Sequence, residues 1–421
     1  MNSKSAALSP QPSAFCRFCG ASLRVTMVDL GMSPLANAYL TAEQLHQMES
    51  FYPLRVYVCE HCWLAQLEAF TAPESIFSDY AYFSSYSDSW LQHAKAYVEM
   101  AVERFSLNVT SHIIEIASND GYLLQYFVAQ GIPVLGIEPA ANVAASAHQR
   151  GIQTLVRFFG VDLAKELVAH GTQADLVVGN NVLAHVPQLN DFVSGLKIVL
   201  KPHGVITMEF PHLLRLMAEK QFDTIYHEHF SYFSLGTVRA VFAAHGLTLF
   251  DVEELPTHGG SLRIYARHSE DASHPVTPRV AELLGREEAA GLQCIDTYRA
   301  FAEEVKATKR RCLEFFLQAK QQGKSLASYG APAKGNTLLN YLGVRTDFLD
   351  YTVDRSPHKQ GHFLPGTHIP ILHPDVITVT RPDYLVILPW NIQAEIRQQM
   401  AHIREWGGQF VTLIPDVVVS A

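Results

Sequence analysis

Long apolar runs are missing from this sequence. No stretch reaches the ~18 residues that a membrane-spanning helix needs. The N-terminus, MNSKSAALSPQPS, is polar and lacks the apolar core of a signal peptide. We therefore expect a cytoplasmic protein without a membrane partner, in which thiols stay reduced.

Positive charge is also scarce. The formal net charge is −9, and no run of five or more Lys or Arg residues occurs. This balance argues against a nucleic-acid polymer as the main partner. A small phosphorylated ligand stays compatible, because it needs only a few cations and backbone N–H groups. At 421 residues, 48% of them hydrophobic, the chain should fold as two or three domains.

Six cysteines need an explanation other than disulfides if the compartment is reducing. Four of them form the pairs Cys16-x-x-Cys19 and Cys59-x-x-Cys62. Two such pairs present four thiolates, which complete a tetrahedral zinc site. Four thiolates leave no open coordination position, so the predicted Zn²⁺ is structural and stabilises a small N-terminal domain.

From about residue 111, short β-rich runs alternate with helical stretches, which predicts a doubly wound α/β domain. Ile113 to Ala117 reads as a strand, followed by a tight turn and a helix from Tyr122. The next strand ends in Glu138, at the place where such folds bind a ribose diol. A third strand, 174–181, ends in polar residues at the same sheet edge.

The turn after the first of these strands lacks the G-x-G-x-x-G pattern of dinucleotide-binding folds. It reads ASNDG, with one glycine and an aspartate that would repel a pyrophosphate but suits a ligand carrying a cationic amino acid. This difference favours S-adenosylmethionine (SAM) over NAD. The segment HGG (258–260) is either a close backbone approach to a ligand or a simple turn. The candidate cofactor residues are Glu115, Ala117, Asn119, Gly121, Glu138, Phe159, Asn180, Asn181 and His185.

Two of these candidates have a structural alternative. Phe159 either stacks on adenine or packs in the core, and His185 either lines the cofactor site or is a core histidine.

The segment YHEHFSYFS (226–234) is either part of an aromatic core or a group of residues that transfer protons. A metal site there is disfavoured, because adjacent residues of a strand face opposite ways and no H-E-x-x-H spacing occurs.

Taken together, EIASNDGYLL, GIEP, NNVLAHV, YHEHFSYFS and the cysteine pairs resemble the SAM-dependent sugar C-methyltransferases, from Cys16 to about Pro415. The resemblance implies an α/β protein with three domains. These are a zinc-binding N-terminal domain (14–85), a central Rossmann-like class I methyltransferase domain (86–275) and a C-terminal Rossmann-like domain that positions a nucleotide-sugar (276–421).

The family's chemistry makes an enolate beside a ketone, and the enolate takes the methyl group of SAM. Removing the α-proton needs a base of near-neutral pKa, and the enolate oxygen needs donors. The resemblance places the base on His229, with Tyr226 and Glu228 beside it and Tyr80 as a further candidate; Tyr82 is the weaker choice of that pair. Phe230 and its aromatic neighbours are expected to be core, and His227 receives no role.

The last third begins with charged helical stretches over 279–322, on which Cys294 and Cys312 are expected to be buried. SLASYGAPAKGNTLLNYLG then repeats the strand, glycine turn and helix pattern, and Asp354 follows as a second-strand acid. A lysine in a glycine turn suits a diphosphate. The predicted substrate residues are Gly330, Lys334, Asn336, Asp354, Lys359, Trp390 and Asn391.

These patterns predict a SAM-dependent C-methyltransferase acting on a nucleotide-linked 4-keto-deoxysugar, with dTDP or GDP as nucleotide and C-3′ or C-5′ as the methylated carbon. An NAD(P)-dependent sugar dehydrogenase, a sugar epimerase or isomerase, and a non-enzymatic zinc-ribbon protein remain as alternatives. A monomer or weak homodimer is expected.

Overall fold

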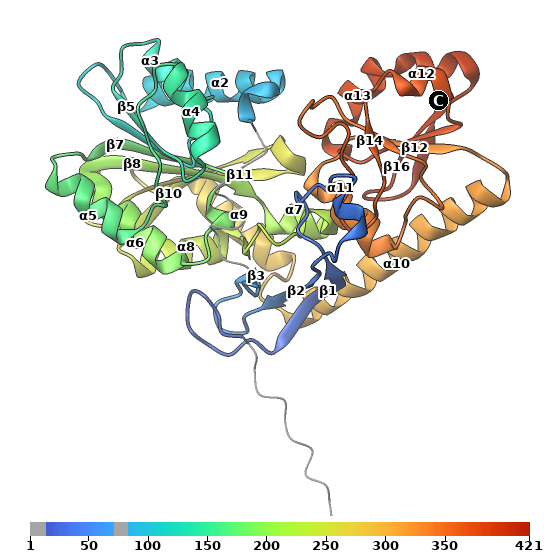
Figure 1. Ribbon diagram of the computed structural model, residues 1–421. Coiled ribbons are helices and arrows are strands. Elements are labelled where there is room, and N and C mark those ends of the chain that lie inside the picture. The colour runs from blue at the N-terminus through green and yellow to red at the C-terminus, as the bar shows by residue number, and fades with distance from the viewer. Residues whose placement is uncertain (1–13, 71–82) are drawn as a thin grey trace, which may run out of the picture.

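Three β-sheets organise the computed structural model, which describes residues 14–70 and 83–421. Figure 1 shows the central unit, coloured cyan to yellow, beside the orange and red C-terminal unit, with the blue N-terminal unit beneath them. The predicted fold class is confirmed. No helix within the described ranges has the length and apolarity needed to cross a membrane.

The N-terminal sheet has the strand order β1-β2-β3-β9. Its last strand comes from the middle of the chain, within YHEHFSYFS: Gln66 pairs with Ser231 and Ala65 with Tyr232. The outer edge of β3 is therefore covered by this segment. The four strands are β1 (Val25–Ser33), β2 (Tyr52–Val58), β3 (Ala65–Leu67) and β9 (Ser231–Tyr232).

The central sheet has the order β10-β11-β8-β7-β4-β5-β6. Its five strands from β8 to β6 are parallel, whereas β11 is antiparallel to β8 and to β10. The strands are β4 (Ile113–Ile116), β5 (Val134–Ile137), β6 (Thr154–Leu155), β7 (Ala174–Asn180), β8 (Leu200–Pro211), β10 (Leu247–Leu255) and β11 (Ser261–His268).

Helices cover this sheet, and all four residues of β4 are buried, as expected for a central parallel strand. The helix after β4 begins at Leu124 rather than at Tyr122, since the glycine turn extends further. The helices are α2 (Asp88–Arg104), α3 (Leu124–Val128), α4 (Ala141–Gln149), α5 (Val161–Ala169), α6 (Leu189–Val199), α7 (Leu213–Ala218), α8 (Leu235–Ala244) and α9 (Pro278–Ala289).

The C-terminal sheet has the order β14-β13-β12-β15-β16-β17, parallel except for the last strand. The strands are β12 (Leu326–Tyr329), β13 (Thr352–Val353), β14 (Ile371–Leu372), β15 (Tyr384–Ile387), β16 (Gln409–Thr412) and β17 (Val418–Ser420). The helices are α10 (Ile295–Gln321), α11 (Ala333–Leu342), α12 (Val376–Thr380) and α13 (Gln393–Gln399).

The long helix α10 runs along the N-terminal and C-terminal units (Figure 1). Cys312 on this helix is buried, as predicted, but Cys294 is exposed. The expectation for Cys294 was wrong because this residue precedes the helix as its N-cap and does not belong to its buried face.

Candidate functional site

The four cysteines of the two pairs come together. Their sulfur atoms all lie within 4.8 Å of one another, and the Cys16–Cys62 and Cys19–Cys59 distances are both 3.5 Å. A tetrahedral site with Zn–S bonds of about 2.3 Å requires sulfur atoms about 3.8 Å apart. The observed spacing fits a four-thiolate zinc site, as the sequence predicted.

The two cysteine turns have the same backbone shape. In one, the N–H of Gly20 donates to Cys16 O over 2.9 Å; in the other, the N–H of Trp63 donates to Cys59 O, also over 2.9 Å. Both donors have positive φ, 74° and 63°. Trp63 is held in this left-handed conformation without being glycine, which indicates a position over-determined by its surroundings.

The predicted base, His229, is buried between η4 (Phe222–Thr224) and β9. Its Nδ1 donates to the carbonyl oxygen of Thr224 over 2.8 Å, because a carbonyl only accepts. The hydrogen of the neutral ring is therefore on Nδ1, and Nε2 carries the basic lone pair. The rings of Tyr226 and His185 lie 4.0 and 4.7 Å from the His229 ring, measured between centroids.

Burial lowers the pKa of His229 well below its ordinary value, and electrostatic interactions with His185, His258 and Lys334 act in the same direction. The hydrogen bond to Thr224 opposes them. Burial likewise lowers the pKa of His185 to about 4. His229 is thus neutral at neutral pH, and its pKa lies below the near-neutral value expected of the base.

The zinc-binding unit supports this segment directly. The backbone N–H of Leu67 on β3 donates to Phe230 O over 3.0 Å. The buried guanidinium of Arg17, between two zinc-site cysteines, lies 5.4 Å from the Phe230 ring centroid and donates to Pro187 O over 3.1 Å. On the other side, Phe230 N–H donates to Ala184 O over 2.7 Å. The expectation that Phe230 and its aromatic neighbours are core is confirmed, because Phe230, Tyr232 and Phe233 are all buried.

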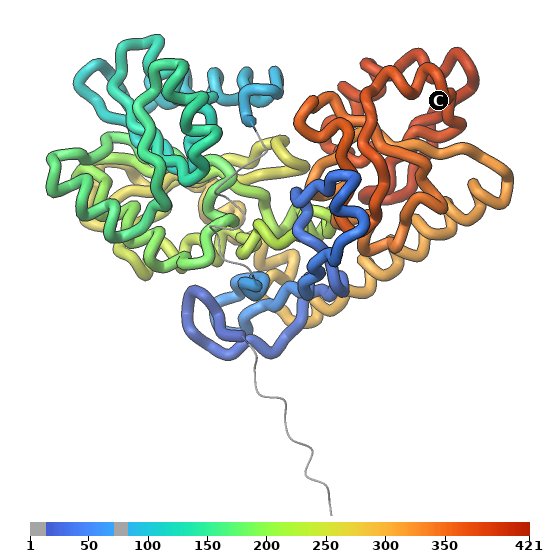
Figure 2. The backbone as a smooth tube through the Cα atoms, in the orientation of Figure 1, coloured from blue at the N-terminus to red at the C-terminus, as the bar shows by residue number. Residues whose placement is uncertain are grey.

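Two residues that the sequence did not single out complete this part of the site. The amide of Asn37 donates to Glu228 Oε1 over 2.6 Å, and the hydroxyl of Tyr39 donates to Ala331 O over 2.6 Å. Both lie in the loop after β1, which Figure 2 shows rising beside the C-terminal unit. They have no motif around them, and their roles depend on contacts between residues about 190 or more positions apart.

His227, to which the sequence assigned no role, is buried. Its Nε2 donates to Pro53 O over 3.2 Å, and its ring packs edge-on against Tyr52. These contacts point away from His229 and join the segment to β2. Tyr80 and Tyr82 lie outside the described residues.

Three residues of the predicted cofactor turn have left-handed backbone conformations. Ala117, Asn119 and Gly121 all have positive φ, of 56°, 50° and 77°. Glu138 holds the turn: one carboxylate oxygen accepts from Asn119 N–H over 3.0 Å and the other from Ala140 N–H over 2.9 Å. Left-handed non-glycine residues concentrate at ligand-binding sites, because only a fixed surrounding structure maintains them.

Some of the remaining cofactor candidates lie at the carboxyl ends of strands, and others are buried or pack against the core. Glu115 is buried in β4, and burial raises its pKa well above the ordinary value. Phe159 is partly buried and packs edge-on against Phe192 of the core, 5.5 Å between ring centroids. Asn180 and Asn181 stand at the carboxyl end of β7, and Asn181 has a φ of 54°. His185, at the end of η3 (Leu183–His185), lies against His229.

The C-terminal turn repeats the central one. Asp354 accepts from Ala331 N–H over 2.8 Å, as Glu138 does from Asn119, and Gly330 has a φ of 92°. The ammonium of Lys359 donates to Ala331 O over 2.9 Å. Asn336 is buried on α11, where its Oδ1 accepts from Asn340.

Three of the predicted substrate residues form one cluster. Lys334 donates to Asn391 Oδ1 over 2.8 Å, and its ammonium lies 4.5 Å from the Trp390 ring centroid. The indole N–H of Trp390 donates to buried Asp223 over 2.7 Å. The cluster reaches the predicted base through η4: Trp390 donates to Asp223, and the next residue, Thr224, accepts from His229.

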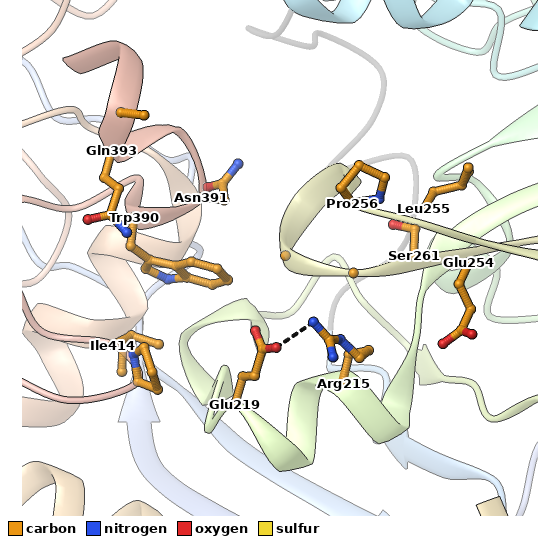
Figure 3. Close-up of a pocket in the computed structure, with 14 residues that line it drawn as sticks. Arg215, Glu219, Glu254, Leu255, Pro256, Ser261, Trp390, Asn391, Gln393 and Ile414 are labelled. Atoms are coloured by element: carbon orange, nitrogen blue, oxygen red, sulfur yellow. Dashed lines mark ion pairs between the residues drawn. The ribbon is translucent and has the colours of Figure 1, made fainter. Parts of the chain in front are cut away.

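A cleft of about 600 Å³ adjoins the cluster (Figure 3). It lies between α7, the end of the β10–β11 hairpin and η6 (Trp390–Ile392), and an ion pair of Arg215 and Glu219 crosses its floor. Its lining residues are Arg215, Glu219, Glu254, Leu255, Pro256, Gly259, Gly260, Ser261, Trp390, Asn391, Gln393, Ala394, Ile414 and Pro415.

Comparison with family models divides the chain into three matched regions. A "Putative zinc binding domain" matches residues 16–77, a "Methyltransferase domain" matches 90–252, and a "C-methyltransferase C-terminal domain" matches 256–415. The C-methyltransferase NovU of Streptomyces niveus is 37% identical over 407 residues, which cover 96% of this chain and 97% of NovU.

Solved structures align with a smaller part of the chain. The magnesium protoporphyrin IX methyltransferase ChlM of Synechocystis PCC 6803, with bound SAM, is 16% identical, with a TM-score of 0.33, over 42% of this chain and 79% of its own. A SAM-dependent methyltransferase of Mesorhizobium loti is 14% identical, with a TM-score of 0.34, over 42% of this chain and 100% of its own.

Proposed function

This chain belongs to the family of SAM-dependent C-methyltransferases, and from that premise we propose that it methylates the carbon next to the ketone of a nucleotide-linked 4-keto-deoxysugar through an enolate. The family assignment sets aside the dehydrogenase, the epimerase and the non-enzymatic alternatives. One observation carries the proposal: buried His229 has its hydrogen fixed on Nδ1 by Thr224, which leaves Nε2 as a base.

In the proposed reaction, Nε2 of His229 takes the proton from the α-carbon, and the electron pair of that C–H bond moves into a C–C double bond. The carbonyl electrons move onto oxygen, where Tyr226, beside His229, is a donor. SAM supplies an electrophilic methyl group, which the α-carbon attacks. Glu228, held by Asn37, is placed to bind a sugar amine or hydroxyl; Tyr80 stays a candidate donor.

The nucleotide is proposed to bind the C-terminal unit. Lys334 and Lys359 supply the positive charge that a diphosphate requires, and the turn from Gly330 supplies backbone groups at the start of α11. Trp390 and Asn391 border the cleft beside this turn. The central unit holds SAM on the turn 117–121, with Glu138 at the ribose and Asn180 and Asn181 toward the methionine end.

The experiment that tests the proposal uses the purified protein with a panel of dTDP- and GDP-linked 4-keto-deoxysugars in deuterated buffer. With SAM, one sugar should gain a methyl group; with S-adenosylhomocysteine, the same sugar should exchange one carbon-bound hydrogen for deuterium. Mass spectrometry follows both changes. Methyl transfer without any exchange would contradict the enolate route, and no change with any sugar would contradict the substrate class.

The pH dependence should reflect the environment of His229. The base works only in its neutral form, and its pKa lies below the ordinary 6.5. We therefore expect kcat/KM to stay constant as the pH falls from the alkaline side to 6.5 and to decrease only at lower pH. Rates measured in overlapping buffers across this range provide the check, and an acid limb centred at or above pH 6.5 would be inconsistent with this prediction.

A further inference from the structure

His258 adopts a conformation that histidine rarely has. It lies in η5 (Thr257–Gly259), the connection between β10 and β11, with φ 54° and ψ 19°. Gly259 and Gly260 follow with φ of 91° and 120°. Three successive residues with positive φ, the first of them not glycine, store strain that only a fixed surrounding structure maintains. Such strain is typical of residues whose side chain is positioned for function.

The surroundings fix this imidazole from several sides. Asn181, itself left-handed with a φ of 54°, donates from Nδ2 to His258 Nε2 over 3.0 Å. The ring packs against Trp90, 5.1 Å between centroids. Gln221 donates to Gly259 O over 2.7 Å, and Trp390 lies so close to Gly259 that an added Cβ would fall 2.4 Å from the indole.

These contacts leave one ring nitrogen available. Because Nε2 accepts from Asn181, the hydrogen of the neutral ring is on Nδ1. Among residues 14–70 and 83–421, Nδ1 has no hydrogen-bond partner, and the buried Oδ1 of Asn181 has none either. A strained hairpin thus presents an unused N–H at the carboxyl end of β7, beside Trp390 of the predicted substrate cluster.

We propose that His258 is a further catalytic residue, whose Nδ1–H donates to the enolate oxygen. The inference rests on the proposed function. The proton that leaves the α-carbon goes to His229 Nε2, the carbonyl oxygen gains the electron pair, and His258 keeps its own proton throughout. When the methyl–sulfur bond breaks, its electron pair stays on sulfur and the ketone re-forms.

The lowered pKa of His258 is consistent with a neutral imidazole that donates a hydrogen bond. The pKa of His258 is lowered to about 4, mainly by burial and also by electrostatic interactions with Lys334 and His93, whereas Glu209 opposes these effects. The ring is therefore uncharged at neutral pH. A neutral imidazole donor polarises a carbonyl without competing as an acid for the proton that the base removes. A donor aimed at a developing oxyanion acts on kcat more than on KM.

The test compares two variants that both accept a left-handed backbone. His258→Gly removes the ring and relaxes φ, whereas His258→Asn keeps an amide N–H where Nδ1 was, and asparagine tolerates positive φ. With the 4-keto-sugar that the wild-type protein methylates, we measure kcat, KM and deuterium exchange in the presence of S-adenosylhomocysteine. Thermal unfolding and S-adenosylhomocysteine affinity control for folding and for the cofactor site.

We expect His258→Gly to lower kcat and the exchange rate by roughly 10²–10³-fold with little change in KM. His258→Asn should recover most of that loss. The proposal is overturned if the glycine variant exchanges at the wild-type rate, if only KM rises, or if the asparagine variant is as slow as the glycine variant. A wild-type protein that neither exchanges nor methylates any sugar would instead remove the proposed function, and this role with it.

Discussion

Replacing His229 with asparagine should lower methyl transfer by roughly 10²–10⁴-fold while the protein stays folded. The amide nitrogen of asparagine matches the position of Nδ1, so it can still donate to Thr224 O, which the wild-type ring contacts at 2.8 Å. The group that is lost is Nε2, the proposed base. The variant thus separates the structural hydrogen bond of His229 from its chemistry.

Deuterium exchange with S-adenosylhomocysteine is the decisive measurement, because it reports proton removal without methyl transfer. Exchange should disappear together with turnover. His227→Gln serves as the matched control: its amide can still donate to Pro53 O, as His227 Nε2 does, and its exchange rate should stay within a few-fold of wild type. Full exchange in His229→Asn would assign the base to another group.

Loss of zinc should abolish activity and destabilise the protein, and Cys59→Ser is the variant to use. Structural zinc contributes on the order of 10 kcal/mol to the folding of small domains that cannot build a core of their own. Here the effect should extend beyond the N-terminal unit, because β3 pairs with β9 and Arg17 packs on Phe230. The zinc site therefore supports the backbone that carries the proposed base.

Three measurements check this prediction: zinc per chain by elemental analysis, the unfolding temperature, and kcat. Wild type should carry one zinc ion, and Cys59→Ser should carry less, unfold at lower temperature and lose turnover. Cys294→Ser, which changes an exposed cysteine outside the cluster, should match wild type in all three. A zinc-free Cys59→Ser protein with normal kcat would show that the catalytic segment does not depend on the metal.

Local patterns were sufficient where a function needs residues that are near in sequence. The spacing of Cys16, Cys19, Cys59 and Cys62 predicted their cluster, since each pair is placed by one short turn. The strand, turn and acid pattern predicted the central fold and the position of Glu138 at the end of the second strand, because the carboxyl ends of parallel strands lie at one edge of the sheet.

The spacing of residues in the sequence did not predict contacts between units that are distant along the chain. Nothing around Asn37, Tyr39 or Arg17 indicates that they contact the segment 226–234 or the C-terminal turn. Their contacts exist because distant parts of the chain pack together. The exposure of Cys294 was missed for a related reason: a one-residue difference in where a helix begins decides which side chains reach its buried face.

The sequence by itself determined the chemical groups of this protein: four thiolates for zinc, a turn suited to SAM and a histidine able to act as a base. These depend on residue type and short spacing, which the chain specifies locally. Only the tertiary structure decided which nitrogen of His229 is basic, that β9 joins the zinc-binding sheet, and that Lys334 and the turn of His258 both lie against Trp390. Burial, tautomer and charge–charge effects depend on neighbours from all three units, so they arise only when the units pack.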